Sequence, residues 1–227
     1  MWKIRTRKTL SLCLKLSVVL CSLGGVAISL FQAVADGYSH WYKRLFYFTA
    51  YSNLSLGFTF LILFFFVLFN KKINRTLALF RYVYTVCITI TLLVFCFILV
   101  PFATPSYHLN RFSSMLTHFF SPIFAIIDFF LFPNDFPIEK KHRLFCVFPP
   151  LFYSTFSIAL SFLLVDFGRG DNFPYPFMNP LSAAKFFGFS REIPFTGTFY
   201  WLLFLAFLVY LFAILLSILH NKNRVEK

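Results

Sequence analysis

The stretch RFSSMLTHFFSPIFAIIDFFLF, residues 111–132, decides the fold class of this chain. It has about the length of one membrane crossing, which takes roughly 20 apolar residues at a rise of 1.5 Å each. Yet it contains His118 and Asp128, with the helix-bending Pro122 between them. Ionisable side chains are costly in hydrocarbon, so those found there usually face the protein interior and have a role. The stretch therefore predicts a membrane helix that carries polar groups with a purpose.

The composition extends this prediction to the whole chain. Of its 227 residues, 59% are hydrophobic and only 13% are charged, whereas a soluble domain is about half apolar and a quarter charged. The apolar residues also come in runs too long for the helices of a soluble core. We therefore expect an all-α integral membrane protein, with residues 1–227 forming a single six-helix domain. The expected spans are about 10–33, 46–69, 76–100, 112–132, 144–165 and 197–219.

The distribution of charge predicts the orientation in the membrane. The net charge is +13, but the Lys and Arg residues gather in short loops and tails, and no nucleic-acid motif is present, so nucleic acid is not an expected partner. Six spans place both termini on one side, where the tails and loops hold 13 Lys and Arg against 6 on the other side. The positive-inside rule therefore predicts cytoplasmic termini and one long extracytoplasmic loop between helices 5 and 6. The Phe- and Lys-rich composition favours a bacterial plasma membrane.

Polar residues gather near the expected outer end of two spans. Span two enters from outside, so Thr49 lies about 5 Å deep, and His118 on span four lies about 9 Å deep. Asn53 follows Thr49 by one helical turn and shares its face, and Ser52 is adjacent to that face. The long loop that carries Tyr175 begins on the same side. Singly, each residue has a structural explanation, such as a hydroxyl bonded to its own helix, but together they indicate a site.

Other polar residues have structural explanations. Asp128 lies about 15 Å deeper than His118 and on another face of the helix, where Arg81 reaches a similar depth from the opposite side. We predict that Arg81 and Asp128 form an ion pair, because a buried pair costs far less than either charge alone. Gly24 and Gly25 in span one predict a close approach of helices. The five cysteines form no CxxC pair, and one intramembrane histidine is no ligand set, so neither a metal nor another cofactor is expected.

Three segments of the chain resemble the androgen-induced protein family, which includes the androgen-dependent TFPI-regulating protein, and its bacterial six-span relatives. They are YFTAYSN at 47–53, MLTHFFSPIFAIIDFFLFP at 115–133 and FPYPF at 173–177, and their order and spacing cover most of the chain. Animal members of this family are membrane threonine hydrolases that cleave esters of fatty acids with hydroxy fatty acids. Their essential pair is the Thr of the first motif and the His of the second. The resemblance therefore implies these roles for Thr49 and His118.

The predicted function is hydrolysis of a lipid or fatty-acid ester near the outer leaflet. A threonine hydroxyl needs a base to become a nucleophile, and a neutral His118 would serve Thr49 in this way. Asn53, Ser52 and Tyr175 are the candidates for binding substrate or the oxyanion. Two other functions stay open at this point, a non-catalytic lipid-binding protein and a small-molecule transporter. The clustering of polar residues at one end disfavours the continuous polar path that a transporter needs.

Overall fold

The computed structural model of the chain describes residues 2–101, 111–168, 170–192 and 195–225, so most of the third expected loop lies outside the described residues. Within the described ranges the fold is all-helical, apart from one antiparallel bridge between Phe189 and Thr196. The regular segments are α1 Trp2–Val19, η1 Leu20–Gly24, α2 Gly25–Gln32, η2 Trp41–Phe46, α3 Phe48–Leu68, α4 Arg75–Val94, η3 Phe95–Leu99, α5 Phe112–Met115, η4 Leu116–Phe120, α6 Ser121–Leu131, α7 Lys140–Leu144, α8 Phe148–Phe162, η5 Pro176–Met178 and α9 Thr198–Val225.

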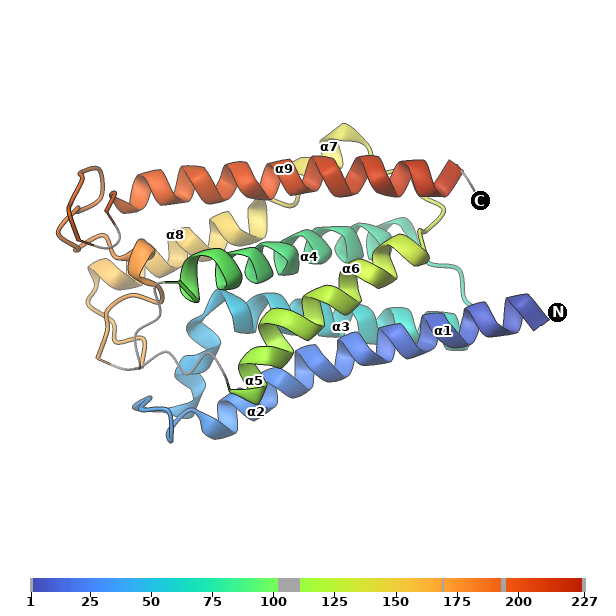
Figure 1. Cartoon of the computed structure of the whole chain (residues 1–227), viewed down its shortest axis with the longest axis horizontal. Helices are drawn as coiled ribbons and strands as arrows, with labels where there is room; N and C mark the ends of the chain where they lie inside the picture. Colours follow the sequence, from blue (N-terminus) through green and yellow to red (C-terminus); the bar gives the residue numbers. More distant parts are fainter. Residues whose placement is uncertain (1, 102–110, 169, 193–194, 226–227) are drawn as a thin grey trace.

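Six helical segments of the described chain are long and apolar enough to cross a membrane, which makes this an integral membrane protein by fold. Backbone groups have no water to bond to in hydrocarbon, so such runs satisfy their N–H and C=O groups within a helix. The six spans are Thr6–Gln32, Phe48–Leu68, Arg75–Leu99, Phe112–Leu131, Lys140–Phe162 and Thr198–Val225. They lie side by side in one bundle, with both ends of the chain at one end of it and the α8–α9 loop at the other (Figure 1).

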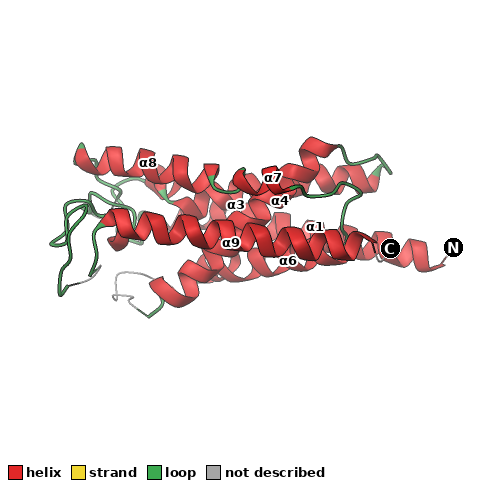
Figure 2. Cartoon of the chain, turned by 90° about the horizontal axis from the view of Figure 1, so that it is seen from above, coloured by secondary structure: helices red, strands yellow, loops and turns green. Residues whose placement is uncertain are grey.

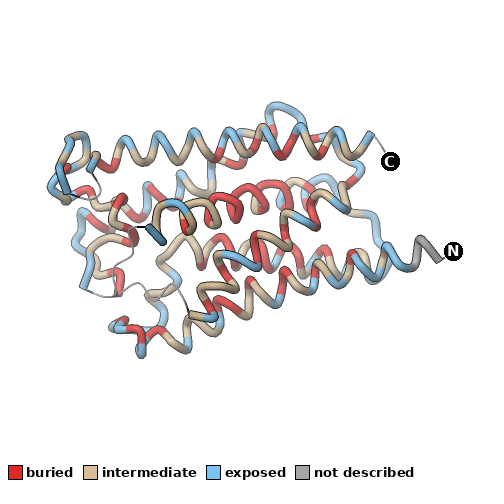
Figure 3. Tube along the Cα trace, viewed as in Figure 1, coloured by how far each residue is buried: buried red, intermediate tan, exposed pale blue. Residues whose placement is uncertain are grey.

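Helix α4 is the centre of this bundle. Its span is 56% buried, against 22–39% for the other five, and it contacts α3, α6 and α9. Buried residues accordingly concentrate along α4 and on the faces that the surrounding helices turn toward it (Figure 3). Seen from above, the long helices run roughly alongside one another (Figure 2). Many large apolar side chains of these helices are exposed on the outside of the bundle. The central position of α4 matters for the site, because α4 forms part of its wall.

The bounds of the first span and of the last two differ from the sequence prediction. The first helix begins at Trp2 and includes the basic tail, and the last continues to Val225. The extension of α9 is held by Asn221, which exchanges two hydrogen bonds of 2.9 Å with the backbone of Ile138. The fifth span is interrupted between α7 and α8, where the prolines of the FPP sequence at 148–150 start a new helix.

Three membrane helices contain a π-helical turn: η1, η3 and η4. Such turns insert one extra residue into the helix and are frequent at functional sites. The turn η4 contains His118, and it directly precedes Pro122 in the first turn of α6. Proline lacks an N–H group and disturbs the helical hydrogen bonds before it. The predicted bend in this span therefore takes the form of a π-helical turn at the histidine.

Candidate functional site

The structure brings Thr49 and His118 together, although they are 69 residues apart in the sequence. The Thr49 hydroxyl oxygen lies 3.1 Å from Nε2 of His118. Thr49 is the second residue of α3, and His118 is in the middle of η4. The two helical segments are joined directly, since Asn53 on α3 donates a hydrogen bond to the carbonyl oxygen of Thr117 at 3.0 Å. The hydroxyl and the imidazole are thus within hydrogen-bond reach.

The backbone determines which nitrogen of His118 carries the proton. Nδ1 lies 3.0 Å from the carbonyl oxygen of Ser114. A carbonyl oxygen only accepts hydrogen bonds, so Nδ1 donates and Nε2 keeps its lone pair. The Thr49 hydroxyl then donates to Nε2. The ring of Phe95 stacks on the imidazole with centroids 4.4 Å apart, which fixes the plane of the ring. Sequence analysis found no carboxylate to orient His118, and here a carbonyl does so.

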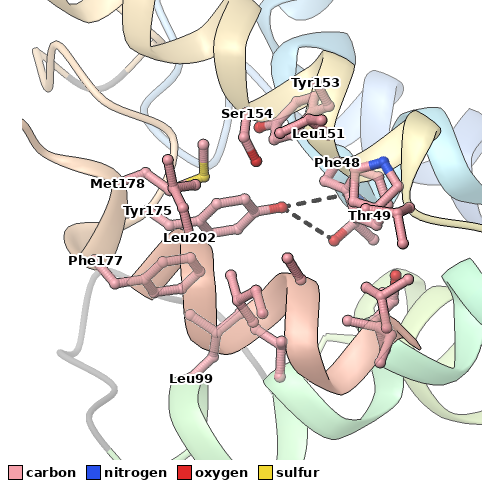
Figure 4. Close-up of a pocket in the computed structure, with 18 of the residues that line it drawn as sticks. Phe48, Thr49, Leu99, Leu151, Tyr153, Ser154, Tyr175, Phe177, Met178 and Leu202 are labelled. Atoms are coloured by element: carbon pink, nitrogen blue, oxygen red, sulfur yellow. Dashed lines mark hydrogen bonds between the residues drawn. The ribbon is translucent and has the colours of Figure 1, made fainter. Parts of the chain in front are cut away.

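Tyr175 from the α8–α9 loop is the third member of the site. Its hydroxyl lies 3.4 Å from the Thr49 hydroxyl and accepts a hydrogen bond from the Thr49 backbone N–H, also at 3.4 Å (Figure 4). Burial raises the pKa of Tyr175 to about 12, so the phenol is neutral and able to donate at neutral pH. Thr49 lies in the first turn of α3, where backbone N–H groups have no partner within the helix and favour negative charge.

The other two residues of the expected cluster do not face the reactive pair. The Asn53 side chain donates one N–H to the Thr49 carbonyl at 2.8 Å and another to the Thr117 carbonyl at 3.0 Å. Both of its N–H groups are therefore used, and the expectation that it donates to an oxyanion is corrected. Ser52 is fully buried, and its hydroxyl lies 3.2 Å from that of Thr91 on α4. Asn53 and Ser52 thus hold α3 against its neighbours.

Two cavities meet at the reactive residues. Thr49, Leu99, His118 and Tyr175 line both of them. The first cavity lies between α4, α8 and α9, and its wall is almost entirely apolar (Figure 4). The second cavity has a larger polar share, and Arg44 is among the residues that line it. The hydroxyl–imidazole pair therefore stands between an apolar chamber and a polar one.

Arg44, which lines the polar chamber, belongs to a set of paired charges on the loops at this end of the bundle. Arg44 contacts the buried carboxylate of Asp36 at 2.5 Å, and Arg111 contacts the same carboxylate at 2.6 Å. Lys43 donates to Asp166 at 2.7 Å and so joins the first loop to the α8–α9 loop. Burial disfavours the charge of Asp166, but its hydrogen bonds from Lys43 and from two backbone N–H groups outweigh this and lower its pKa to about 2.

The predicted pairing of Arg81 with Asp128 is found far from the reactive pair. Arg81 donates to one carboxylate oxygen of Asp128 at 2.7 Å, and Lys15 donates to the other at 2.7 Å. Both cations and the carboxylate are at most 2% exposed. Sequence analysis missed Lys15, although a lysine inside the first apolar run was a signal for it. Within the described residues, no group of three or more His, Cys, Asp or Glu side chains could hold a metal ion.

The fold and site define a six-span membrane protein with a threonine–histidine pair between two cavities. No protein-family model matches the chain, and no curated protein or solved structure matches it significantly. The three motifs at 47–53, 115–133 and 173–177 lie in separate parts of the chain. These motifs contribute Thr49 and His118 together with Tyr175, the residues that meet in the structure.

Proposed function

We propose that this protein is a membrane hydrolase of lipid esters, with Thr49 as nucleophile and His118 as general base. The observation that carries the proposal is the 3.1 Å contact from the Thr49 hydroxyl to Nε2 of His118, whose Nδ1 is engaged by the Ser114 carbonyl. A hydroxyl with an adjacent base that a third group orients is the arrangement of an activated nucleophile. The family resemblance points to fatty acid esters of hydroxy fatty acids as the substrate.

The proposed reaction has two steps. The Thr49 oxygen attacks the ester carbonyl carbon while its proton passes to Nε2 of His118. The tetrahedral intermediate then collapses, the bond from carbon to the alcohol oxygen breaks, and His118 protonates the leaving alcohol. In the second step His118 takes a proton from water, and the resulting hydroxide attacks the acyl carbonyl carbon. The bond from that carbon to the Thr49 oxygen then breaks, His118 returns the proton to the Thr49 oxygen, and the acid is released. Nε2 begins and ends each cycle with its lone pair free.

The oxyanion of each intermediate needs hydrogen-bond donors close to the nucleophile. The proposed donors are the Tyr175 hydroxyl and the backbone N–H of Thr49 at the first turn of α3. These two groups bond each other in the structure, and the oxyanion would take the place of that bond. An N–H at a helix start favours a developing negative charge. One donor of this kind is worth about 3 kcal/mol of transition-state stabilisation.

The two chambers suit the two halves of a lipid ester. The apolar cavity accommodates hydrocarbon, whereas the polar chamber supplies a route for water and for the leaving alcohol. The sequence prediction of cytoplasmic termini would place the reactive pair near the outer leaflet, because the α8–α9 loop with Tyr175 lies at the end of the bundle opposite the termini (Figure 1). The carbonyl of a lipid ester lies at that boundary while its chains stay in hydrocarbon.

The proposal is tested by labelling the purified protein in detergent with an alkyl fluorophosphonate, followed by mass spectrometry of the adduct. We expect an adduct on Thr49 that is lost in Thr49→Val and in His118→Gln. The matched control is Thr59→Val on the same helix, whose hydroxyl bonds the Ser55 carbonyl at 2.7 Å. Absence of an adduct on folded wild-type protein would refute the activated hydroxyl and favour a non-catalytic lipid-binding protein.

A further inference from the structure

We propose that the apolar cavity between α8 and α9 is the acyl-chain site, that it is filled sideways from the bilayer, and that Ala206 limits the length of chain it accepts. The term acyl rests on the proposed hydrolase function. The site itself does not, because the cavity would hold a hydrocarbon chain whether or not Thr49 reacts.

Apart from the reactive pair, the wall of the cavity is mostly apolar. Beyond Thr49 and His118 it is formed mostly by aliphatic side chains from α4, α8 and α9. Of the hydroxyls in the wall, Thr91 donates to the Cys87 carbonyl at 3.2 Å and Tyr153 to the Phe46 carbonyl at 3.0 Å. Thr91 and Tyr153 therefore bond within the protein, and Ser154 adds one further hydroxyl to the wall, so most of what the cavity offers a ligand beyond the reactive pair is apolar contact.

Helix α9 supplies one continuous side of the cavity. Leu202, Leu205, Ala206 and Val209 line it, and their spacing of three and four residues places them on one helix face. From Leu202 to Val209 this face extends about 10 Å along the helix. Val209 is only 1% exposed and belongs to the core packed around α4. The cavity is therefore closed where α9 meets the core.

The side of the cavity formed by α8 reaches the outer surface of the bundle. Leu151 lines the cavity and is also 50% exposed. It lies on a membrane span, so its exposed part faces the region that lipid chains occupy. A hydrocarbon chain can therefore pass from the bilayer to Thr49 without crossing the polar chamber. Transfer between two apolar surroundings carries little hydrophobic cost.

Ala206 has the smallest side chain on the α9 face of the cavity. It lies one turn beyond Leu202 and just before the closed end at Val209. A Phe at this position would fill the inner part of the cavity and leave the part beside Thr49 open. Ala206→Phe should then exclude esters with long acyl chains and still admit esters with short ones.

The first test measures occupancy without turnover. Wild type, Thr49→Ala, Ala206→Phe and the control Leu203→Phe are reconstituted in lipid nanodiscs with a palmitic acid that carries a diazirine near its methyl end. Leu203 is on the same helix but 54% exposed and outside the cavity wall. After irradiation, we expect adducts on α8 and α9 residues of the cavity in wild type and Thr49→Ala. Ala206→Phe should reduce them at least about tenfold, and Leu203→Phe should not.

The second test measures selectivity with the p-nitrophenyl esters of palmitate and butyrate. Ala206→Phe should lower the palmitate-to-butyrate ratio of kcat/KM at least about tenfold, with Ala206→Leu between it and wild type. Adducts outside the cavity, adducts insensitive to Ala206, or an unchanged ratio would overturn the inference. Wild-type protein that is labelled in the cavity but hydrolyses neither ester would refute the hydrolase proposal and leave the lipid site standing.

Discussion

Nε2 of His118 lies 3.1 Å from the Thr49 hydroxyl, while Nδ1 of the same ring lies 3.0 Å from the Ser114 carbonyl. These two contacts use both ring nitrogens, one as acceptor and one as donor. A neutral carbonyl in the place of the usual carboxylate leaves the imidazole oriented without adding a negative charge near the membrane. Thr49, His118 and the Ser114 carbonyl are thus arranged as the three groups of a catalytic triad are, but none of them carries a fixed charge.

Substitutions at Thr49 and His118 should show whether turnover depends on the chemistry of these side chains or only on their packing. His118→Gln keeps a polar side chain but removes the base, so we expect ester turnover to fall by about 10²–10⁴-fold. Thr49→Val removes the hydroxyl at nearly constant volume and should abolish turnover, whereas Thr49→Ser should retain part of it. The measurement is kcat for a p-nitrophenyl ester in detergent, with thermal unfolding as the folding control. Undiminished turnover by Thr49→Val would exclude Thr49 as nucleophile.

Tyr175→Phe should lower kcat by about 10²-fold with a small change in KM, because an oxyanion donor acts on the transition state more than on bound substrate. The matched control is Tyr153→Phe, since the Tyr153 hydroxyl also lines the apolar cavity but donates to the Phe46 carbonyl. It should change kcat much less. A change in KM alone for Tyr175→Phe would assign that residue to binding.

Replacing the buried charged residues one at a time should lower the stability of the fold by unequal amounts. Asp128→Ala leaves Lys15 and Arg81 without a counter-charge and should destabilise the fold by about 3–5 kcal/mol. Lys15→Met leaves one cation with one carboxylate, a neutral pair, and should cost much less. Thermal unfolding in one detergent compares the variants. Equal losses for Lys15→Met and Asp128→Ala would show that charge balance is not what stabilises the cluster.

The glycine pair of span one offers two neighbouring substitutions with opposite expectations. A Cβ at Gly25 would come within 2.7 Å of the Thr117 side chain and 2.9 Å of that of Leu116, whereas one at Gly24 meets nothing within 4 Å. Gly25→Ala should therefore displace η4, which contains His118, and reduce both turnover and the unfolding temperature. Gly24→Ala should leave both near wild type. The reverse ranking would contradict the packing of α2 on η4.

The ion pair between Lys43 and Asp166, which joins the first loop to the α8–α9 loop, should break in acid. The pKa of Asp166 is lowered from its ordinary 3.8 to about 2, so its carboxylate stabilises the folded loop fully above about pH 4 and loses this effect as the pH falls toward 2. Pepsin cleavage of the α8–α9 loop, followed between pH 4 and 2, measures the opening. At pH 4, pepsin should cleave Asp166→Asn faster than wild type, because only wild type keeps the ion pair. At pH 2, the two proteins should be cleaved at the same rate. Identical cleavage profiles for the two proteins would exclude a stabilising role for the Lys43–Asp166 ion pair.

The sequence alone determined the fold class and the positions of the main polar residues. Six apolar runs are a local property, and in a bilayer such runs become helices because their backbone groups have no other partner. Residue counts along each helix also predicted that Thr49 and His118 lie at a similar level of the bundle, and the two side chains are in contact in the structure. Local counting fails at the terminal ends of the first and last helices and at the break between α7 and α8, where prolines restart the helix.

Only the tertiary structure decided how these residues are used. The Thr49–His118 contact spans 69 residues and the Lys15–Asp128 contact spans 113, and such pairings depend on how helices rotate against one another. Packing against neighbouring helices also engages Asn53 with the Thr117 carbonyl, besides the Thr49 carbonyl of its own helix, and Ser52 with Thr91 of α4, away from the roles expected of them. The apolar cavity forms where α4, α8 and α9 pack together, so no single stretch of sequence encodes it. Helix formation is a local consequence of composition, whereas sites arise from packing between distant segments.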